Sequence, residues 1–196
     1  MIYPSITALP DRAITDRELL DYLIDPSART MFPVDSRAFV RVDISLRHYW
    51  HTLFDVCPEL LDIADPEGME IFEPFLAWAA THSLSMGWHY YLWVARWLAQ
   101  SPYVTQLDGT LNERLMAAAA ARWAVLDRSA NAGIVLGRTG SDSWIVAWKP
   151  NTLTDGRRVE RLDVCGAVPA PVFDYGVFFA ATDELDEFPG WQPIPC

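Results

Sequence analysis

The 22 residues from Pro74 to Ala95 contain no Asp, Glu, Lys or Arg. An uncharged stretch of this length either crosses a membrane or lies inside a folded protein, because a spanning helix needs about 20 mainly apolar residues. Six positions within it are poorly suited to lipid. We therefore expect a buried helix in a soluble core and no membrane as a partner. These positions are Thr81, His82, Ser83, Ser85, Gly87 and His89.

Helices are expected on both sides of this stretch. Thr15 with Glu18, and Thr110 with Glu113, have the spacing of a capping box, in which two side chains bind the free N–H groups at the start of a helix. In this half of the chain, alternating polarity predicts a strand over residues 38–44. The expected helices cover residues 15–25, 45–56, 58–64, 70–100 and 110–127, and a break between 83 and 87 is left open.

After Asn131 the sequence changes to short runs of β-branched and aromatic residues. The links between these runs are rich in Gly, Asp and Pro, and short links favour antiparallel pairing. Helices followed by a small sheet define an α+β fold. We predict a single domain over residues 1–196, with a helical lobe to about residue 130 and a β lobe over 131–196. The expected strands cover residues 134–138, 143–148, 157–164 and 172–180.

Composition excludes some classes of function and suggests a compartment. A net charge of −11 over 196 residues argues against a protein that binds nucleic acid directly by releasing counterions. Cys57, Cys165 and Cys196 are far apart and form no CxxC pair, which is typical of a reducing compartment. The first residues lack the pattern of a signal peptide. These features predict a cytoplasmic protein, and no cofactor is expected.

Fixed charges are unevenly distributed along the chain. The 48 residues between Arg47 and Arg96 contain no Lys or Arg, and a second such stretch follows Arg161. Clustered carboxylates repel one another, so they either solubilise the surface or face a basic protein or a divalent cation. We expect them to bind a basic partner, a toxin or an effector, with Trp191 as an aromatic anchor. The carboxylates are Asp55, Glu59, Asp62, Asp65, Glu67, Glu70, Glu73, Asp183, Glu184, Asp186 and Glu187.

His48, His51 and Asp55 recur at helical spacing and fall on one face of an expected helix. Three such ligands can hold Zn²⁺ with a fourth position open. The opposite face of this helix is apolar, and a surface helix turns polar residues outward. A solvated or partner-facing stripe is therefore the first interpretation, and a metal site is the alternative.

His82, Ser85, His89 and Arg96 share one strip of the uncharged stretch if its helix is continuous. Polar groups on a helix that is apolar all round must find partners. They either satisfy one another in the core or form a pocket, in which His89 acts as general base and Arg96 binds an anion. A third group that would orient the base is not visible, so a hydrolytic triad is not supported.

The sequence contains no P-loop, GxGxxG, HExxH or GxSxG motif. Together with the charge distribution, this favours a non-enzymatic acidic protein that neutralises or escorts a basic partner protein, as an immunity protein or an antitoxin does. Two alternatives stay open: a small enzyme that uses His82, His89 and Arg96, and an inhibitor whose carboxylates mimic nucleic acid. Nine tryptophans are compatible with either a core or a binding platform.

Overall fold

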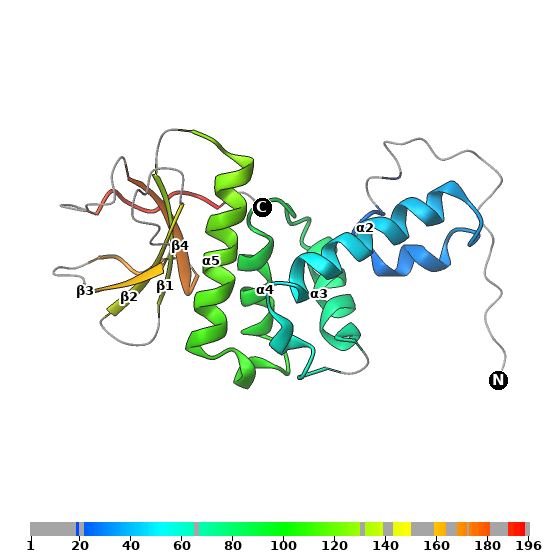
Figure 1. Cartoon of the computed structure of the whole chain (residues 1–196), viewed down its shortest axis with the longest axis horizontal. Helices are drawn as coiled ribbons and strands as arrows, with labels where there is room; N and C mark the ends of the chain where they lie inside the picture. Colours follow the sequence, from blue (N-terminus) through cyan, green and yellow to red (C-terminus); the bar gives the residue numbers. More distant parts are fainter. Residues whose placement is uncertain are drawn as a thin grey trace. The chain divides into compact units, whose positions relative to one another are not determined.

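The computed structural model describes residues 19, 22–64, 67–129, 132–138, 143–149, 159–163, 168–171, 173–180 and 188–194. Within these residues the chain forms four α-helices, three short 3₁₀ helices and a four-stranded antiparallel sheet (Figure 1). The helices come first and the sheet follows, so the expected α+β fold is confirmed. The chain divides into two compact units, which span residues 1–82 and 83–196.

The first unit is helical in its described part. It contains the 3₁₀ helices η1 (Pro26–Thr30) and η2 (Pro58–Leu60) and the α-helices α2 (Arg37–Phe54) and α3 (Met69–Thr81). A proline opens each 3₁₀ helix, where a backbone N–H would have no helical partner. Most of the helix expected over residues 15–25 lies outside the described residues. The buried core of this unit includes Val42, Leu46, Leu53, Phe54, Ile71, Phe72, Phe75 and Leu76.

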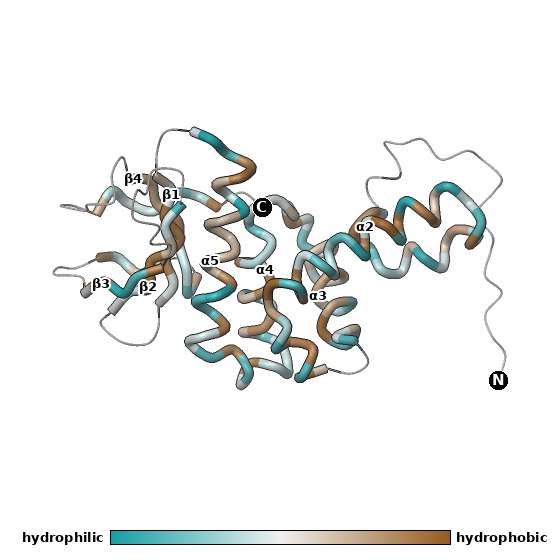
Figure 2. Tube along the Cα trace, in the orientation of Figure 1, coloured by the Kyte–Doolittle hydropathy of each residue, from teal (hydrophilic) through white to brown (hydrophobic). Residues whose placement is uncertain are grey.

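Helix α2 occupies the place of the strand expected over residues 38–44. The hydroxyl of Ser36 caps the start of this helix by accepting a hydrogen bond from a backbone N–H three residues later, at 3.1 Å. Val42 and Leu46 are buried four residues apart, whereas Ile44 between them is exposed. Figure 2 shows hydrophobic and hydrophilic residues alternating along the turns of α2. The strand prediction was wrong because so short an alternating run fits the period of a helix as well as that of a strand.

The second unit begins with helices α4 (Tyr90–Leu98) and α5 (Gly109–Leu126), with η3 (Val104–Gln106) between them. The break left open in the long expected helix is present, since α3 ends at Thr81 and α4 begins at Tyr90. Helix α5 is capped by Asp108, whose carboxylate accepts the N–H of Leu111 at 2.8 Å. The capping box expected at Thr110 is therefore wrong by two residues. None of the described helices is both long and apolar enough to cross a membrane.

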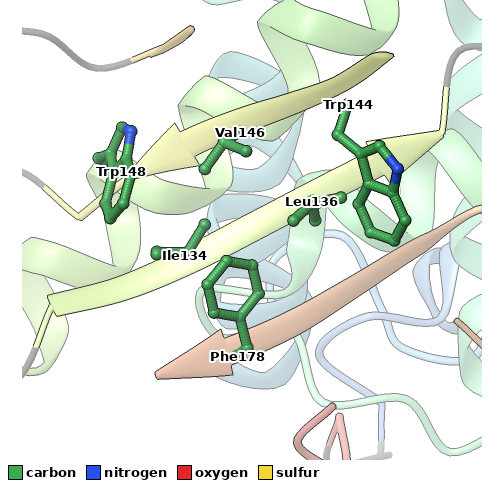
Figure 3. Packing of buried hydrophobic residues seen from close by; sticks show 6 residues of the cluster. All are labelled: Ile134, Leu136, Trp144, Val146, Trp148 and Phe178. Atoms are coloured by element: carbon green, nitrogen blue, oxygen red, sulfur yellow. The ribbon is translucent and has the colours of Figure 1, made fainter. Parts of the chain in front are cut away.

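The sheet has the strand order β3-β2-β1-β4, and all of its pairs are antiparallel. Its strands are β1 (Ala132–Arg138), β2 (Ser143–Trp148), β3 (Val159–Asp163) and β4 (Tyr175–Ala180), close to the expected ranges. One face carries a cluster of large apolar side chains from the three strands β1, β2 and β4 (Figure 3). The cluster consists of Ile134, Leu136, Trp144, Val146, Trp148 and Phe178.

Helix α5 packs on β1 and β2, and two glycines of β1 allow its close approach. A Cβ atom at Gly133 would collide with the ring of Trp123, and one at Gly137 would collide with the sulfur of Met116. Because α4 also packs on α5, both helices belong with the sheet. The boundary between the compact units therefore falls after His82, whereas the sequence placed a lobe boundary near residue 130.

Candidate functional site

The second unit contains a pocket of about 550 Å³ beside α4 and the start of α5. Helix α4 contributes Arg96 to its wall, the first turn of α5 contributes Gly109 and Asn112, and the segment before β4 contributes Phe173. A concave site of this size is within the range that small molecules occupy in proteins. The pocket joins residues that are up to 80 positions apart in the sequence, so no local motif indicates it.

Arg96 lies over an aromatic ring in the wall of this pocket. The central carbon of its guanidinium group is 4.0 Å from the centre of the Phe173 ring. A cation over a ring face is attracted by the ring quadrupole, so this contact helps to position the guanidinium group. Of the three residues expected to form a polar pocket, Arg96 lines this one, whereas His82 and His89 do not.

Tyr175 forms another part of the pocket wall, at the first residue of β4. Its side chain is buried, and its hydroxyl has no hydrogen-bond partner within the described part of the chain. Burial raises the pKa of this phenol, and nearby Arg96 lowers it while Asp174 raises it. The phenol is therefore protonated at neutral pH, with charges of opposite sign close by.

His89 is buried between aromatic rings rather than exposed in a cavity. Its ring centre is 3.9 Å from that of Trp88 and 6.0 Å from that of Trp93. Both ring nitrogens are buried and have no hydrogen-bond partner among the described residues. Burial lowers the pKa of His89 to about 4, so the imidazole is neutral at pH 7. This environment is that of a packed core ring, and none of the described residues is hydrogen-bonded to His89 so as to orient it as a general base.

His82 lies in the other compact unit, at the C-terminal end of α3. It is exposed, and its Nδ1 is 2.8 Å from the carbonyl oxygen of Trp78. Because the helix is interrupted after Thr81, His82, His89 and Arg96 do not share one helix face. The strip that the continuous helix would have formed is absent from the structure.

His48, His51 and Asp55 lie on and just after α2 and are exposed. The Nδ1 atom of His51 is 3.4 Å from a carboxylate oxygen of Asp55. Over the described ranges, no group of three or more His, Cys, Asp or Glu side chains is arranged to hold a metal ion. The described residues therefore give no support to a zinc site at these three positions.

The carboxylates expected to bind a partner lie in different environments, and some of them are outside the described residues. We call residues 55–73 the acidic segment, and its described carboxylates are exposed except for the half-buried Glu59. Glu73 lies 3.9 Å from Arg29, so this carboxylate has a cation from an element distant in sequence. Trp191 packs inside the second unit, where its ring stacks on Trp144 at 5.5 Å. The remaining expected carboxylates, Asp65, Asp183, Glu184, Asp186 and Glu187, lie outside the described residues.

Sequence reasoning did not identify the polar group formed by Lys149 and Asp127. Lys149, the one lysine of the chain, is fully buried, and its ammonium group lies 3.1 Å from the carboxylate of Asp127 and 3.2 Å from the hydroxyl of Ser129. The same nitrogen is 5.4 Å from the centre of the Trp123 ring. The signal in the sequence was a single lysine in a chain that otherwise uses arginine, directly after an apolar strand.

These features define an α+β protein in which a helical unit precedes a helix-covered sheet with a pocket. The sequence model of a family described as "Methanobactin biosynthesis cassette protein MbnC-like" matches residues 29–195. This match includes most of both units, and the chain belongs to the MbnC-like family. No curated protein matches the chain.

The family assignment corrects the function expected from the charge distribution. An immunity protein or an antitoxin neutralises a partner, whereas a biosynthesis cassette protein contributes to making a product. The expectation of an inhibitor was therefore wrong, including its variant of nucleic-acid mimicry. Acidic charge misled the prediction because net charge reports on solubility and association but does not identify a function.

Proposed function

We propose that this protein takes part in methanobactin biosynthesis. The observation that carries this proposal is the family match over residues 29–195. The matched region contains all of the described helices from α2 onward and all four strands of the sheet. The proposal therefore rests on the whole fold rather than on one short motif.

The test is to express a methanobactin biosynthesis cassette in a heterologous host with and without the gene for this chain. The mature product is then measured by mass spectrometry. We expect the product to be lost without the chain and to return when the gene is supplied on a plasmid. Equal amounts of product in both strains would contradict the proposal.

We also propose that the protein works in contact with a basic protein of the same pathway, through the acidic segment. Asp62 and Glu67 support this proposal because their side chains are exposed. Exposed carboxylates of one sign accelerate encounter with a basic surface. Exposed apolar side chains of α2 in the same unit, Val40 and Ile44, would add contact area to such an interface.

The partner proposal is tested by measuring association of the purified chain with each protein of the cassette by biolayer interferometry at low and high salt. We expect Asp62→Lys to slow association several-fold at low salt and to weaken its salt dependence. Asp35→Lys is the matched control, since Asp35 is an exposed carboxylate of the same unit outside the acidic segment. Equal effects of both substitutions, or binding to none of the proteins, would contradict the proposal.

We propose the cytoplasm as the place of action. The three cysteines of the sequence are far apart and form no CxxC pair, which suits a reducing compartment. Immunoblotting of separated cytoplasmic and periplasmic fractions tests this location. Recovery of the chain mainly in the periplasmic fraction would contradict it.

A further inference from the structure

The first compact unit also has a pocket, of about 400 Å³, which we call the α2 pocket. Helix α2 contributes Arg47 and Trp50 to its wall, and the turn before α3 contributes Glu67. Leu46 and Phe72 are buried and add an apolar part to the lining. A pocket of this volume is within the range that small molecules occupy in proteins.

Trp50 lies between the two charged groups of the wall. Arg47 and Trp50 are three residues apart on α2, so they share one side of the helix. The indole N–H of Trp50 donates a hydrogen bond to the backbone carbonyl of Glu67 at 3.0 Å, which holds this residue beside the ring. A guanidinium group, an aromatic ring and a carboxylate therefore belong to one site.

Both charged groups have hydrogen-bonding capacity for a ligand. The Nε of Arg47 donates to Asp43 at 2.7 Å, which orients the guanidinium group, and the side chain is 72% exposed. Its two terminal nitrogens have no hydrogen-bond partner among the described residues. Glu67 is exposed, and its ionised carboxylate only accepts hydrogen bonds. The site thus offers a pair of donors and a pair of acceptors.

The charges around the α2 pocket favour a ligand without a net charge. Asp43 pairs with both arginines of the lining, since it also lies 3.2 Å from Arg29. Glu73 lies 3.9 Å from the same Arg29. The positive charges are therefore balanced, and the carboxylate of Glu67 would repel an anion.

A planar base fits these requirements. Guanine presents two adjacent acceptors, O6 and N7, which a guanidinium group binds through two parallel donors. Its other edge presents two adjacent donors, N1–H and the 2-amino group, which suit a carboxylate. Its ring can stack on an aromatic side chain. We propose that the α2 pocket binds the guanine base of a small molecule, with O6 and N7 at Arg47, the donor edge at Glu67 and the ring against Trp50.

The experiment uses the full chain and isothermal titration calorimetry, with guanosine and adenosine as probes. Adenosine is the comparison because its 6-amino group would face the donors of Arg47. We expect guanosine to bind at least about tenfold more tightly than adenosine. Absence of guanosine binding at concentrations up to about 1 mM, or equal affinity for the two nucleosides, would overturn the proposal.

A nucleotide carries the same base, so GMP tests which part of the ligand is recognised. GMP should bind about as tightly as guanosine, because the arginines of the pocket are already paired with carboxylates. An affinity for GMP about tenfold or more above that for guanosine would show that the phosphate is recognised. That outcome would overturn the assignment of the neutral base.

Substitutions of exposed residues locate the binding in the α2 pocket. Arg47→Met and Glu67→Gln should each weaken guanosine binding about tenfold. Their matched controls are Arg37→Met and Asp62→Asn, since Arg37 and Asp62 are exposed in the same unit and do not line the pocket. Unchanged affinity in either pocket variant, or an equal loss in its control, would overturn the proposed location.

Inosine tests the contact with Glu67 directly, because it lacks only the 2-amino group of guanosine. It should bind several-fold more weakly than guanosine to the natural protein, and this difference should shrink in Glu67→Gln. A difference of the same size in both proteins would overturn the placement of the donor edge at Glu67. This outcome is separate from the partner proposal, whose test substitutes Asp62 outside the pocket.

Discussion

Lys149 places its ammonium nitrogen 3.1 Å from a carboxylate oxygen of Asp127, and the two partners differ sharply in exposure. The lysine side chain is 0% exposed, whereas the aspartate side chain is 41% exposed. The charge of Asp127 is therefore partly solvated by water, while that of Lys149 depends on its protein neighbours. This asymmetry determines which partner the fold needs more.

Asp127→Ala should destabilise the protein more than Lys149→Met. The first substitution leaves a buried ammonium group without its carboxylate, whereas the second leaves a carboxylate that reaches water and places an apolar chain against Trp123. Urea denaturation at pH 7 gives the order of the two free energies of unfolding. The double variant should have about the same free energy of unfolding as Lys149→Met alone. A larger loss of stability in Lys149→Met than in Asp127→Ala would contradict the predicted order.

The same carboxylate should account for part of the loss of stability of the protein at acid pH. The backbone N–H of Ser129, and then the ammonium group of Lys149, lower the pKa of Asp127 from 3.8 to about 2. A folded-state pKa below the unfolded value stabilises the fold above the unfolded pKa and loses this contribution as the pH falls. The loss should fall between about pH 4 and pH 2. Stability measured over this window should depend less on pH in Asp127→Asn than in the natural protein.

His89 predicts a second pH dependence, at higher pH. Burial lowers its pKa from 6.5 to about 4, so the unfolded chain binds more protons than the fold between these values. Stability should therefore fall as the pH is lowered from 7 to 4. His89→Phe keeps a ring beside Trp88 and removes the titration. If both proteins lose the same stability over this range, His89 is not the group responsible.

Tyr175→Phe should leave the protein as stable as before or raise its stability by about 1 kcal/mol. The hydroxyl of Tyr175 is buried and has no hydrogen-bond partner among the described residues, so its removal relieves an uncompensated desolvation. Chemical denaturation measures the change. Tyr90→Phe, at another buried tyrosine of the same unit, is the comparison. A loss of more than about 1 kcal/mol in Tyr175→Phe would mean that its hydroxyl is bound in solution.

Gly133→Ala should destabilise the protein by about 1–3 kcal/mol, because the added methyl group collides with the ring of Trp123 between β1 and α5. Gly109→Ala is the control, since a Cβ atom there meets nothing within 4 Å. In a helix, alanine is favoured over glycine, so the control should be neutral or more stable by up to about 1 kcal/mol. The midpoint temperature of thermal unfolding is measured for both variants. Equal midpoints would contradict the close packing of α5 on β1.

The sheet was more predictable from the sequence than the first helices. Strand β2 runs from Ser143 to Trp148 as expected, because its apolar run is bounded on one side by turn residues. Helix α2 was partly misread, since alternation around Val42 fits both a strand and one face of a helix. The tertiary contacts that bury Val42 and Leu46 decide between the two, and they are not visible in a short window of sequence.

The pocket could be predicted only in part. Arg96 was recognised as an unusual charge next to an uncharged stretch, but its neighbours Phe173 and Tyr175 come from a segment far along the chain. His89 was given a chemical role because histidine is a frequent base. Its aromatic surroundings, which lower its pKa, arise from helix packing and could not be deduced from spacing.

The strand order also sets when the pocket exists during synthesis. Strand β2 follows β1 within a few residues, whereas β4, the other neighbour of β1, is the last of the four to be made. Pairing of distant strands is slower than formation of a local hairpin, because a longer loop must be closed. Since Phe173, Asp174 and Tyr175 immediately precede or begin β4, a nascent chain lacks one wall of the pocket until this strand has been made. The pocket is thus completed only after all four strands of the sheet have left the ribosome.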